Sequence, residues 1–203
     1  MEKKIITISR EFGSGGRTIG KMVAKELGIP YYDKELVKQV AVESGLNEAY
    51  IEEEGEDAPV KSLLAMFSSR GCQGSLNGMS MNDFLWVMQR SVILELAEKG
   101  PCVIIGRCAD YILKDREDCL NVFIHASMEV RAERIVRLYG QTDKNPEKRL
   151  EEKDKKRKVH YKYYTEQEWG MSQNYHLSLD SGVIGIEKCA ELIMDLARTS
   201  NNL

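Results

Sequence analysis

Residues 5–21 read IITISREFGSGGRTIGK: an apolar run, then several glycines, then a segment with helical character. A strand, a glycine-rich turn and a helix start in this order build an anion site, because backbone N–H groups and the positive end of the helix dipole converge there. Glycines allow the tight turn and the close approach of the backbone to an anion. From these residues alone, the stretch is either a phosphate-binding loop or a glycine turn with a purely structural use.

The loop departs from the usual phosphate-binding pattern, G-x-x-x-x-G-K-[ST], in which the lysine reaches the outer phosphates and the hydroxyl contacts Mg²⁺. When Arg10 is aligned with the first glycine, Gly15 matches the second glycine, Gly16 stands instead of the lysine, and Thr18 follows one residue after the hydroxyl position. Removing one preorganised electrostatic contact typically costs roughly 10²–10³ in rate. We therefore expect a nearby cation to compensate, with Arg17 the first choice and Arg10 the second.

Strands and helices alternate along the chain. Short apolar runs predict strands at 4–8, 30–33, 102–106, 119–126 and 174–180. Helical spacing of apolar residues predicts helices at 18–27, 33–44, 82–99, 128–139 and 185–199. Strands that are apolar on both faces are typical of a parallel sheet covered by helices on two sides. The sequence therefore predicts one α/β domain over residues 1–203 with a five-stranded parallel sheet.

Two segments interrupt this alternation. Residues 45–80 contain an acidic patch at 52–57 and a glycine- and serine-rich stretch, which predict a loop-rich insertion. Residues 144–169 are dense in charges of both signs, which is typical of a long, solvent-exposed helix. For the same reason we expect surface positions for three arginines in and before this segment: Arg134, Arg137 and Arg149.

Composition excludes several classes of protein. Apolar residues make up 42% and charged residues 30%, as in soluble globular proteins, and no apolar run approaches the roughly 20 residues that span a bilayer. With no secretory signal at the N-terminus, we expect a cytoplasmic protein without a membrane partner. A net charge of −3 argues against general nucleic-acid binding. The five cysteines lack paired spacing, so we expect reduced thiols rather than disulfides or a zinc site.

Six segments in chain order resemble the cytidylate kinase-like branch of the P-loop nucleoside monophosphate kinases. FGSGGRT (12–18) parallels that family's AGSGKGT, and DKKR (154–157) matches the D-x-x-R of its mobile lid. The other four are LGIPYYD (27–33), VIIGRCADYIL (103–113), IHASMEVRAERI (124–135) and LSLDSGVIGIEKCAELI (177–193). The resemblance covers almost the whole chain except residues 45–90.

This resemblance implies a three-layer P-loop NTPase fold and transfer of a phosphoryl group from ATP to a nucleoside monophosphate, CMP or dCMP by analogy, with Mg²⁺. The donor phosphates would contact Gly13, Ser14, Gly15, Gly16 and Arg17, with Thr18 on the metal. The acceptor would contact Asp33, Arg107, Asp154 and Arg157. Arg17, Arg131 and Arg157 would stabilise the transferring group. Residues 33–100 would form the acceptor side and residues 140–170 a lid that excludes water.

The chain also departs from the family beyond Gly16. Ile105 and Cys108 stand where the family has two aspartates that order Mg²⁺-bound water, and Asp110 can replace them only through a different turn. DKELVKQ (33–39) replaces a stretch in which serine and arginine seat the acceptor, although Lys34 or Lys38 can restore the charge. Two alternatives therefore stay open: a weak or inactive nucleotide-binding protein of this fold, and a kinase for a non-nucleotide small molecule. A homodimer is also left open.

Overall fold

The computed structural model describes residues 4–33, 36, 38, 40–42 and 80–199. Five parallel strands form one sheet in the order β2-β3-β1-β4-β5. They are β1 (Ile5–Arg10), β2 (Tyr31–Tyr32), β3 (Cys102–Ile105), β4 (Cys119–His125) and β5 (Leu177–Asp180). The predicted α/β fold with a five-stranded parallel sheet is confirmed. Because β1 pairs with β3 on one side and β4 on the other, its carboxyl end lies where the strand order reverses, which is where such sheets bind ligands.

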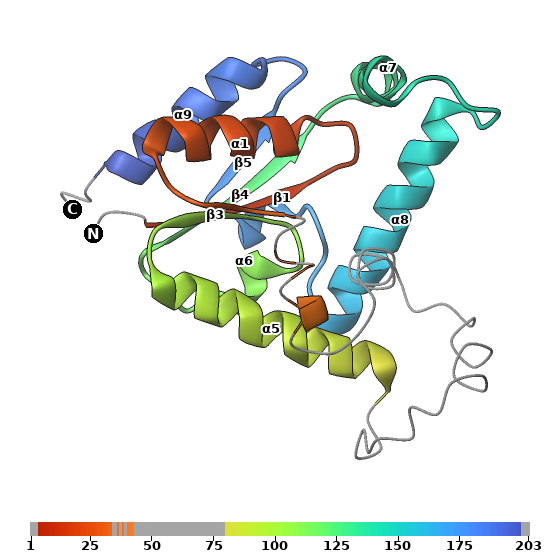
Figure 1. The fold of residues 1–203 in the computed structure, drawn as a ribbon. Helices are drawn as coiled ribbons and strands as arrows, with labels where there is room; N and C mark the ends of the chain where they lie inside the picture. Colours follow the sequence, from red (N-terminus) through yellow and green to blue (C-terminus); the bar gives the residue numbers. More distant parts are fainter. Residues whose placement is uncertain (1–3, 34–35, 37, 39, 43–79, 200–203) are drawn as a thin grey trace.

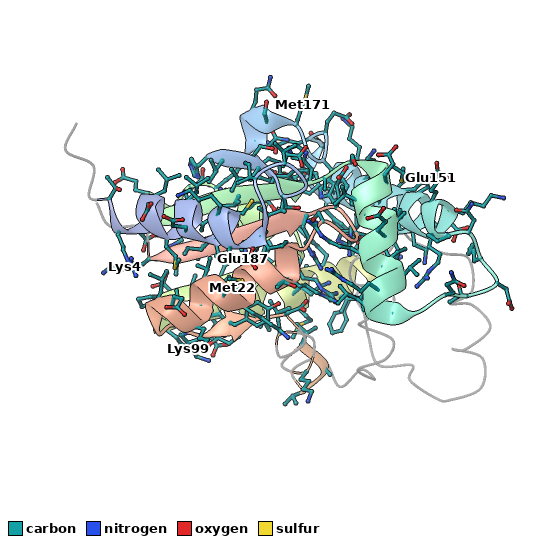
Figure 2. All side chains as sticks on the ribbon, turned by 90° about the horizontal axis from the view of Figure 1, so that it is seen from above. Lys4, Met22, Lys99, Glu151, Met171 and Glu187 are labelled. Atoms are coloured by element: carbon teal, nitrogen blue, oxygen red, sulfur yellow. The ribbon has the colours of Figure 1, made fainter. Side chains whose placement is uncertain are left out.

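Helices cover both faces of the sheet (Figure 1). They are α1 (Gly16–Leu27), α5 (Met81–Lys99), α6 (Ala109–Ile112), α7 (Met128–Tyr139), α8 (Pro146–Thr165) and α9 (Ile186–Arg198), with a 3₁₀ turn at Ser172–Asn174. α1 and α9 lie on one face and α5 and α6 on the other, while α8 stands beyond the carboxyl ends of the strands. Seen from above, α1 and α9 lie side by side, with Met22 labelled on α1 and Glu187 on α9 (Figure 2).

The core has two halves, one on each face of the sheet. Successive strand residues point to opposite faces, so Ile5 packs with α5 residues such as Val92, whereas Ile6 packs with α1 and α9 residues such as Val23 and Ile193. All these side chains are buried. Burial on both faces explains why the strands appear in the sequence as continuous apolar runs rather than as an alternation.

Capping residues set several helix ends. The side chain of Ser127 accepts a hydrogen bond from the backbone N–H of Val130 at the start of α7. The side chain of Asn145 accepts one from the backbone N–H of Glu147 at the start of α8. Gly28 ends α1 in the left-handed conformation. These are the residues that favour such ends in general, because they satisfy backbone groups that a helix leaves unpaired.

The charged helix is only partly the exposed one that the sequence predicts. α8 buries five side chains: Leu150, Asp154, His160, Tyr161 and Thr165. Two of these residues, Asp154 and His160, are of polar types that the charge pattern places in solvent. The prediction of a solvent-exposed helix is therefore wrong for this side of α8. The reason is tertiary, because one side of α8 packs against α7 and the loop that follows β1.

Several predictions lie outside the described residues. They concern the insertion at 45–80 apart from Ser80, half of the residues of the helix at 33–44, Lys34 and Cys72. The cysteines of the described part, namely Cys102, Cys108, Cys119 and Cys189, are buried and free, as expected. Within the described ranges, no helix has both the length and the apolar character that crossing a membrane requires.

Candidate functional site

The glycine-rich loop joins the carboxyl end of β1 to the first turn of α1. Gly13 and Gly15 have φ values of 80° and 85°, in the left-handed region that glycine adopts without strain. A Cβ atom on Gly13 would lie 2.9 Å from the carbonyl oxygen of Arg131, so space as well as conformation requires glycine there. Ser14 is buried, and its hydroxyl donates a hydrogen bond to the carbonyl oxygen of Glu11. The loop therefore presents backbone rather than side chains at the start of α1, as an anion site needs.

Two pockets meet beside this loop. The first, called the loop pocket, is lined by Arg10, Glu11, Phe12, Gly13, Gly15, Gly16, Arg17, Thr18, Leu138, Tyr139 and Arg157. The second, called the Arg107 pocket, is lined by Ser9, Arg10, Gly106, Arg107, Cys108, Arg157, His160, Tyr161 and Trp169. Arg10 and Arg157 line both pockets, so these two arginines lie where the pockets meet. A negatively charged group that passes between the pockets would meet both arginines.

Arg17, the expected replacement for the loop lysine, is paired with Asp33. Its Nε lies 2.9 Å from Oδ2 of Asp33, and its Nη2 donates a hydrogen bond to Oδ1 at 3.2 Å. The side chain of Arg17 is 43% exposed and that of Asp33 is 13% exposed. Both residues line a third pocket, called the Asp33 pocket, together with Thr18, Lys21, Tyr31, Leu138 and Tyr139. The structure thus joins a predicted donor residue to a predicted acceptor residue.

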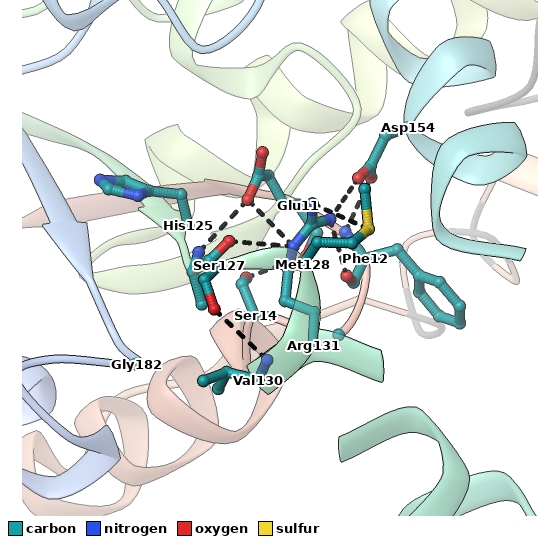
Figure 3. A network of polar contacts seen from close by, with 12 residues as sticks. Glu11, Phe12, Ser14, His125, Ser127, Met128, Val130, Arg131, Asp154 and Gly182 are labelled. Atoms are coloured by element: carbon teal, nitrogen blue, oxygen red, sulfur yellow. Dashed lines mark hydrogen bonds and ion pairs between the residues drawn. The ribbon is translucent and has the colours of Figure 1, made fainter. Parts of the chain in front are cut away.

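Arg131 and Asp154 form a buried ion pair that ties α7 and α8 to the loop (Figure 3). Nη1 of Arg131 lies 2.6 Å from Oδ2 of Asp154 and also donates to the carbonyl oxygen of Phe12. Oδ1 of Asp154 accepts a hydrogen bond of 2.8 Å from the backbone N–H of Phe12. Nε of Arg131 lies 3.3 Å from Oε2 of Glu11 and donates to the carbonyl oxygen of Ala126. The Arg131–Asp154 pair therefore connects the glycine-rich loop to both α7 and α8.

Arg157 extends from α8 over the same loop. Its Nη1 donates a hydrogen bond of 3.2 Å to the carbonyl oxygen of Arg10. It also lies 3.6 Å from Oδ1 of Asp154, one helical turn away, and its guanidinium carbon lies 5.9 Å from the ring centre of Phe12. The structure therefore brings together Arg131, Asp154 and Arg157, three residues that the resemblance assigned to the lid and its base.

Arg107 follows β3 in an unusual backbone conformation. Gly106, Arg107 and Cys108 have φ values of 66°, 59° and 53°, which is three left-handed residues in succession. Non-glycine residues in this region carry strain, and such strain concentrates at functional sites. The side chain of Arg107 is buried, and its Nη1 donates to Oε1 of Gln89 on α5 at 3.3 Å. Arg107 and Asp33, both predicted to bind the acceptor, line different pockets.

Arg134 is a site residue that sequence reasoning missed. Its side chain is only partly exposed, and its Nη1 donates to the carbonyl oxygen of Ser14 and to Oγ of Ser181, both at 2.9 Å. Its Nη2 donates to the carbonyl oxygen of Ser181 at 3.0 Å. Arg134 thereby joins the loop to the segment after β5. The available signal was its spacing of three residues from Arg131, which puts both on one side of α7. Arg137 is exposed, as expected.

Asp110 does not face the Arg107 pocket as a replacement for the missing aspartates. It is buried on α6, and the hydroxyl of Tyr161 donates a hydrogen bond of 2.7 Å to its Oδ2. Burial raises the pKa of Asp110 to about 6, against the opposing effect of the Tyr161 hydrogen bond. Ile105 and Cys108 are buried as well. This carboxyl group therefore links α6 to α8 inside the protein.

Thr18, the predicted metal contact, lines the loop pocket. It is exposed in the first turn of α1. Within the described part of the chain, no group of three or more His, Cys, Asp or Glu side chains is arranged to hold a metal ion. Mg²⁺ in phosphate sites usually keeps several waters and is bound by one or two carboxylates together with phosphate oxygens, so the contact with Thr18 stays a prediction.

Known proteins resemble this chain over most of its length. Residues 5–183 match the model of the cytidylate kinase-like family. A cytidylate kinase of Aeropyrum pernix is 26% identical over 192 residues, which cover 94% of this chain and 97% of that protein. A cytidylate kinase of Archaeoglobus fulgidus is 28% identical over 195 residues, covering 93% and 92%.

Solved structures show the same fold. An uncharacterized protein of Eubacterium ventriosum aligns with a TM-score of 0.71 at 27% identity, covering 97% of this chain and 99% of that one. A shikimate kinase of Acinetobacter baumannii, in complex with shikimate, aligns with a TM-score of 0.53 at 19% identity, covering 95% and 92%. The second likeness concerns the fold alone.

Proposed function

Because the chain belongs to the cytidylate kinase-like family, we propose that it transfers the γ-phosphoryl group of ATP to a nucleoside monophosphate, with CMP and dCMP as the first acceptors to test. One observation carries this proposal: Arg10 and Arg157 line both the loop pocket and the Arg107 pocket. Phosphoryl transfer needs two phosphate sites that meet, with cations at the junction, and it needs no nucleophilic side chain. The relatives of Aeropyrum pernix and Archaeoglobus fulgidus are cytidylate kinases, which supports the choice of acceptor.

In the proposed reaction, a bond forms between an oxygen of the acceptor phosphate and the γ-phosphorus of ATP. The bond from that phosphorus to the β,γ-bridging oxygen breaks, and the oxygen keeps the electron pair, which yields ADP and a nucleoside diphosphate. Gly13, Ser14, Gly15, Gly16 and Arg17 bind the donor phosphates in this proposal. Charge on the transferring group is met by Arg17, Arg131 and Arg157, which act by position and not by bond formation.

The acceptor is bound on the Arg107 side. Arg107 has the planar fork of donors that suits a phosphate group, and Arg157 lines the same pocket. Asp33, which lines a different pocket, and Asp154 are the two further acceptor contacts of this proposal. Thr18 would hold Mg²⁺, which neutralises phosphate charge when it is bound. Residues 140–170, with α8 at their centre, act as the lid that keeps water from the phosphoryl group.

The decisive experiment is a transfer assay on the purified protein. ATP and Mg²⁺ are combined with CMP, dCMP, UMP, AMP and GMP, and with small hydroxyl-containing compounds, and the phosphorylated product is identified by ³¹P NMR. We expect Mg²⁺-dependent formation of ADP together with CDP or dCDP, and a higher KM for the acceptor in Arg107→Ala. Turnover of a hydroxyl compound alone would support the small-molecule kinase, and ATP binding without turnover would support the non-catalytic alternative.

A further inference from the structure

We infer that Arg10 supplies the positive charge that a lysine at position 16 supplies in the usual phosphate-binding loop. Gly16 is glycine because the side chain of Arg10 occupies the space beside it. This inference rests on the proposed function and names the residue that binds the outer phosphates of the donor. The loop departs from the usual pattern at positions 10 and 16. According to this inference the two departures depend on each other, because the arginine at position 10 requires glycine at position 16.

The first step is steric. A Cβ atom built on Gly16 would lie 2.6 Å from Cβ of Arg10 and 2.9 Å from its Cγ, closer than real Cβ atoms approach. These atoms are at the root of the Arg10 side chain, so rotation of the guanidinium end does not move them away. The backbone at Arg10 is held as well, since it ends β1 in register with Ile124 of β4. A lysine at position 16 therefore requires a smaller residue at position 10, and glycine is the residue that the usual pattern has there.

The second step is the location of the charge. Arg10 is 5% exposed, ends the central strand of the sheet and lines both the loop pocket and the Arg107 pocket. A guanidinium stays protonated in proteins, so its charge is present at this junction at any working pH. Its planar fork binds phosphate oxygens through two hydrogen bonds at once. The outer phosphates of a donor in the loop pocket would lie at the same junction, because they must reach an acceptor in the Arg107 pocket.

Each of the other cations near the loop has side-chain contacts of its own in this structure. Two guanidinium nitrogen atoms of Arg17 contact the carboxylate of Asp33. Arg131 is held by Asp154 and by two backbone carbonyl groups. Lys21 lies one turn further along α1, with its Nζ 5.8 Å from the ring centre of Tyr31. Arg157 reaches the junction from the opposite side, on α8, and binds the carbonyl oxygen of Arg10.

The test measures how affinity depends on the number of phosphates. Calorimetry compares ATP, ADP and AMP on the wild type and on Arg10→Met, which removes the charge but keeps much of the volume. We expect Arg10→Met to lower the affinity for ATP and ADP roughly 10- to 100-fold, as loss of a charge-assisted hydrogen bond does, and to leave AMP unchanged. Arg10→Lys should keep part of the preference for ATP over AMP. Circular dichroism checks that each variant is folded.

A swap of the two positions tests the coupling. Gly16→Lys alone should lower both ATP affinity and stability, because the new side chain meets Arg10. The double variant Arg10→Gly/Gly16→Lys recreates the usual loop, and we expect it to bind ATP more tightly than either Gly16→Lys or Arg10→Met. Such a recovery is a non-additive effect, as contacting residues produce.

The outcomes separate this inference from the proposed function. A wild type that binds ATP, with Arg10→Met equal to it, overturns the role of Arg10 and leaves the kinase proposal standing. If Arg10→Met loses affinity for AMP and ATP equally, the role of Arg10 is overturned too, since the loss would not depend on the outer phosphates. A double variant no better than Gly16→Lys overturns the coupling. A wild type that binds no ATP overturns both proposals.

Discussion

Asp154 on α8 and Arg131 on α7 meet at 2.6 Å through a carboxylate oxygen and a guanidinium nitrogen, next to the loop that follows β1. The other carboxylate oxygen of Asp154 accepts a hydrogen bond from the backbone N–H of Phe12. One acidic side chain therefore joins a helix of the charged segment to both the neighbouring helix and the loop. Both side chains are largely buried, which makes the pair sensitive to removal of one partner.

Removing Asp154 should destabilise the protein strongly. In Asp154→Ala the guanidinium of Arg131, whose side chain is 7% exposed, loses its closest buried partner. We expect the free energy of unfolding to fall by roughly 3–5 kcal/mol, measured by urea denaturation. The matched control is Glu152→Ala on the same helix, because Glu152 is 56% exposed and pairs with Lys144 at the surface. That change should cost less than about 1 kcal/mol. Equal losses in the two variants would contradict the prediction.

Replacing Gly13 should cost more than replacing a glycine of similar conformation elsewhere. Gly13 and Gly28 have φ values of 80° and 65°, so alanine is strained at both. A Cβ at Gly13 would lie 2.9 Å from the carbonyl oxygen of Arg131, whereas a Cβ at Gly28 would meet nothing within 4 Å. We expect about 1 kcal/mol of destabilisation for Gly28→Ala, and a larger loss for Gly13→Ala together with weaker ATP binding. Chemical denaturation and calorimetry measure the two effects.

Asp110 should make stability depend on pH. Burial raises its pKa to about 6 in the folded protein, against about 3.9 for an unperturbed aspartate. The folded state therefore binds more protons than the unfolded state between these values, so the stability that Asp110 contributes is present below about pH 4 and is lost as pH rises through about 6. Asp110→Asn keeps an acceptor for the Tyr161 hydroxyl and does not titrate.

The check is the difference between the unfolding free energies of Asp110→Asn and the wild type. From pH 4 to pH 7 this difference should shift in favour of the variant by roughly 2 kcal/mol, which is most of the free energy that the separation of the two pKa values represents. Urea denaturation at each pH measures it, and other titrating groups cancel in the difference. Parallel curves for the two proteins over this range would show that Asp110 does not carry the effect.

Arg134 should matter for the loop although it does not line the loop pocket. In Arg134→Met the carbonyl oxygen of Ser14 and both oxygen atoms of Ser181 lose a charged donor. We expect a loss of roughly 1.5–3 kcal/mol in the free energy of unfolding and a higher KM for ATP, because the loop is less firmly held. Arg137→Met, an exposed neighbour on α7, is the control and should change stability by no more than about 0.5 kcal/mol. The free energy of unfolding and the KM for ATP of the two variants test this prediction, and equal values for both variants would contradict it.

The layout of strands and helices was predictable because its signals are local. Buried parallel strands are continuous apolar runs, and the helix predicted at 128–139 has the observed bounds of α7. α1 begins two residues before its predicted start, at Gly16, since helical conformation begins directly after the left-handed Gly15. α6 was not predicted, because a helix of four residues is too short for the helical spacing of apolar residues to be recognised.

The contacts of the charged side chains were not predictable in the same way. Asp154 and Arg131 are 23 residues apart, and Arg134 and Ser181 are 47 apart. The charge pattern alone does not distinguish these groups from the exposed charges around them, although the resemblance singled out Arg131 and Asp154, and the spacing from Arg131 was the signal for Arg134. The surface expectation for Arg134 was wrong for that reason, while the site roles of Arg17, Asp33, Arg107, Arg131, Asp154 and Arg157 stay predictions that the experiments above test.

The amino-acid sequence by itself determined the α/β fold, the glycine loop after the first strand and the absence of a lysine at position 16, because each is written in a short run of residues. The tertiary structure decided where the nearby cations lie. Arg17 is next to Gly16 in the chain, but successive helical residues are separated by about 100° around the axis, and its side chain reaches Asp33. Arg10 is six residues away, yet the turn of the loop brings its side chain against Gly16.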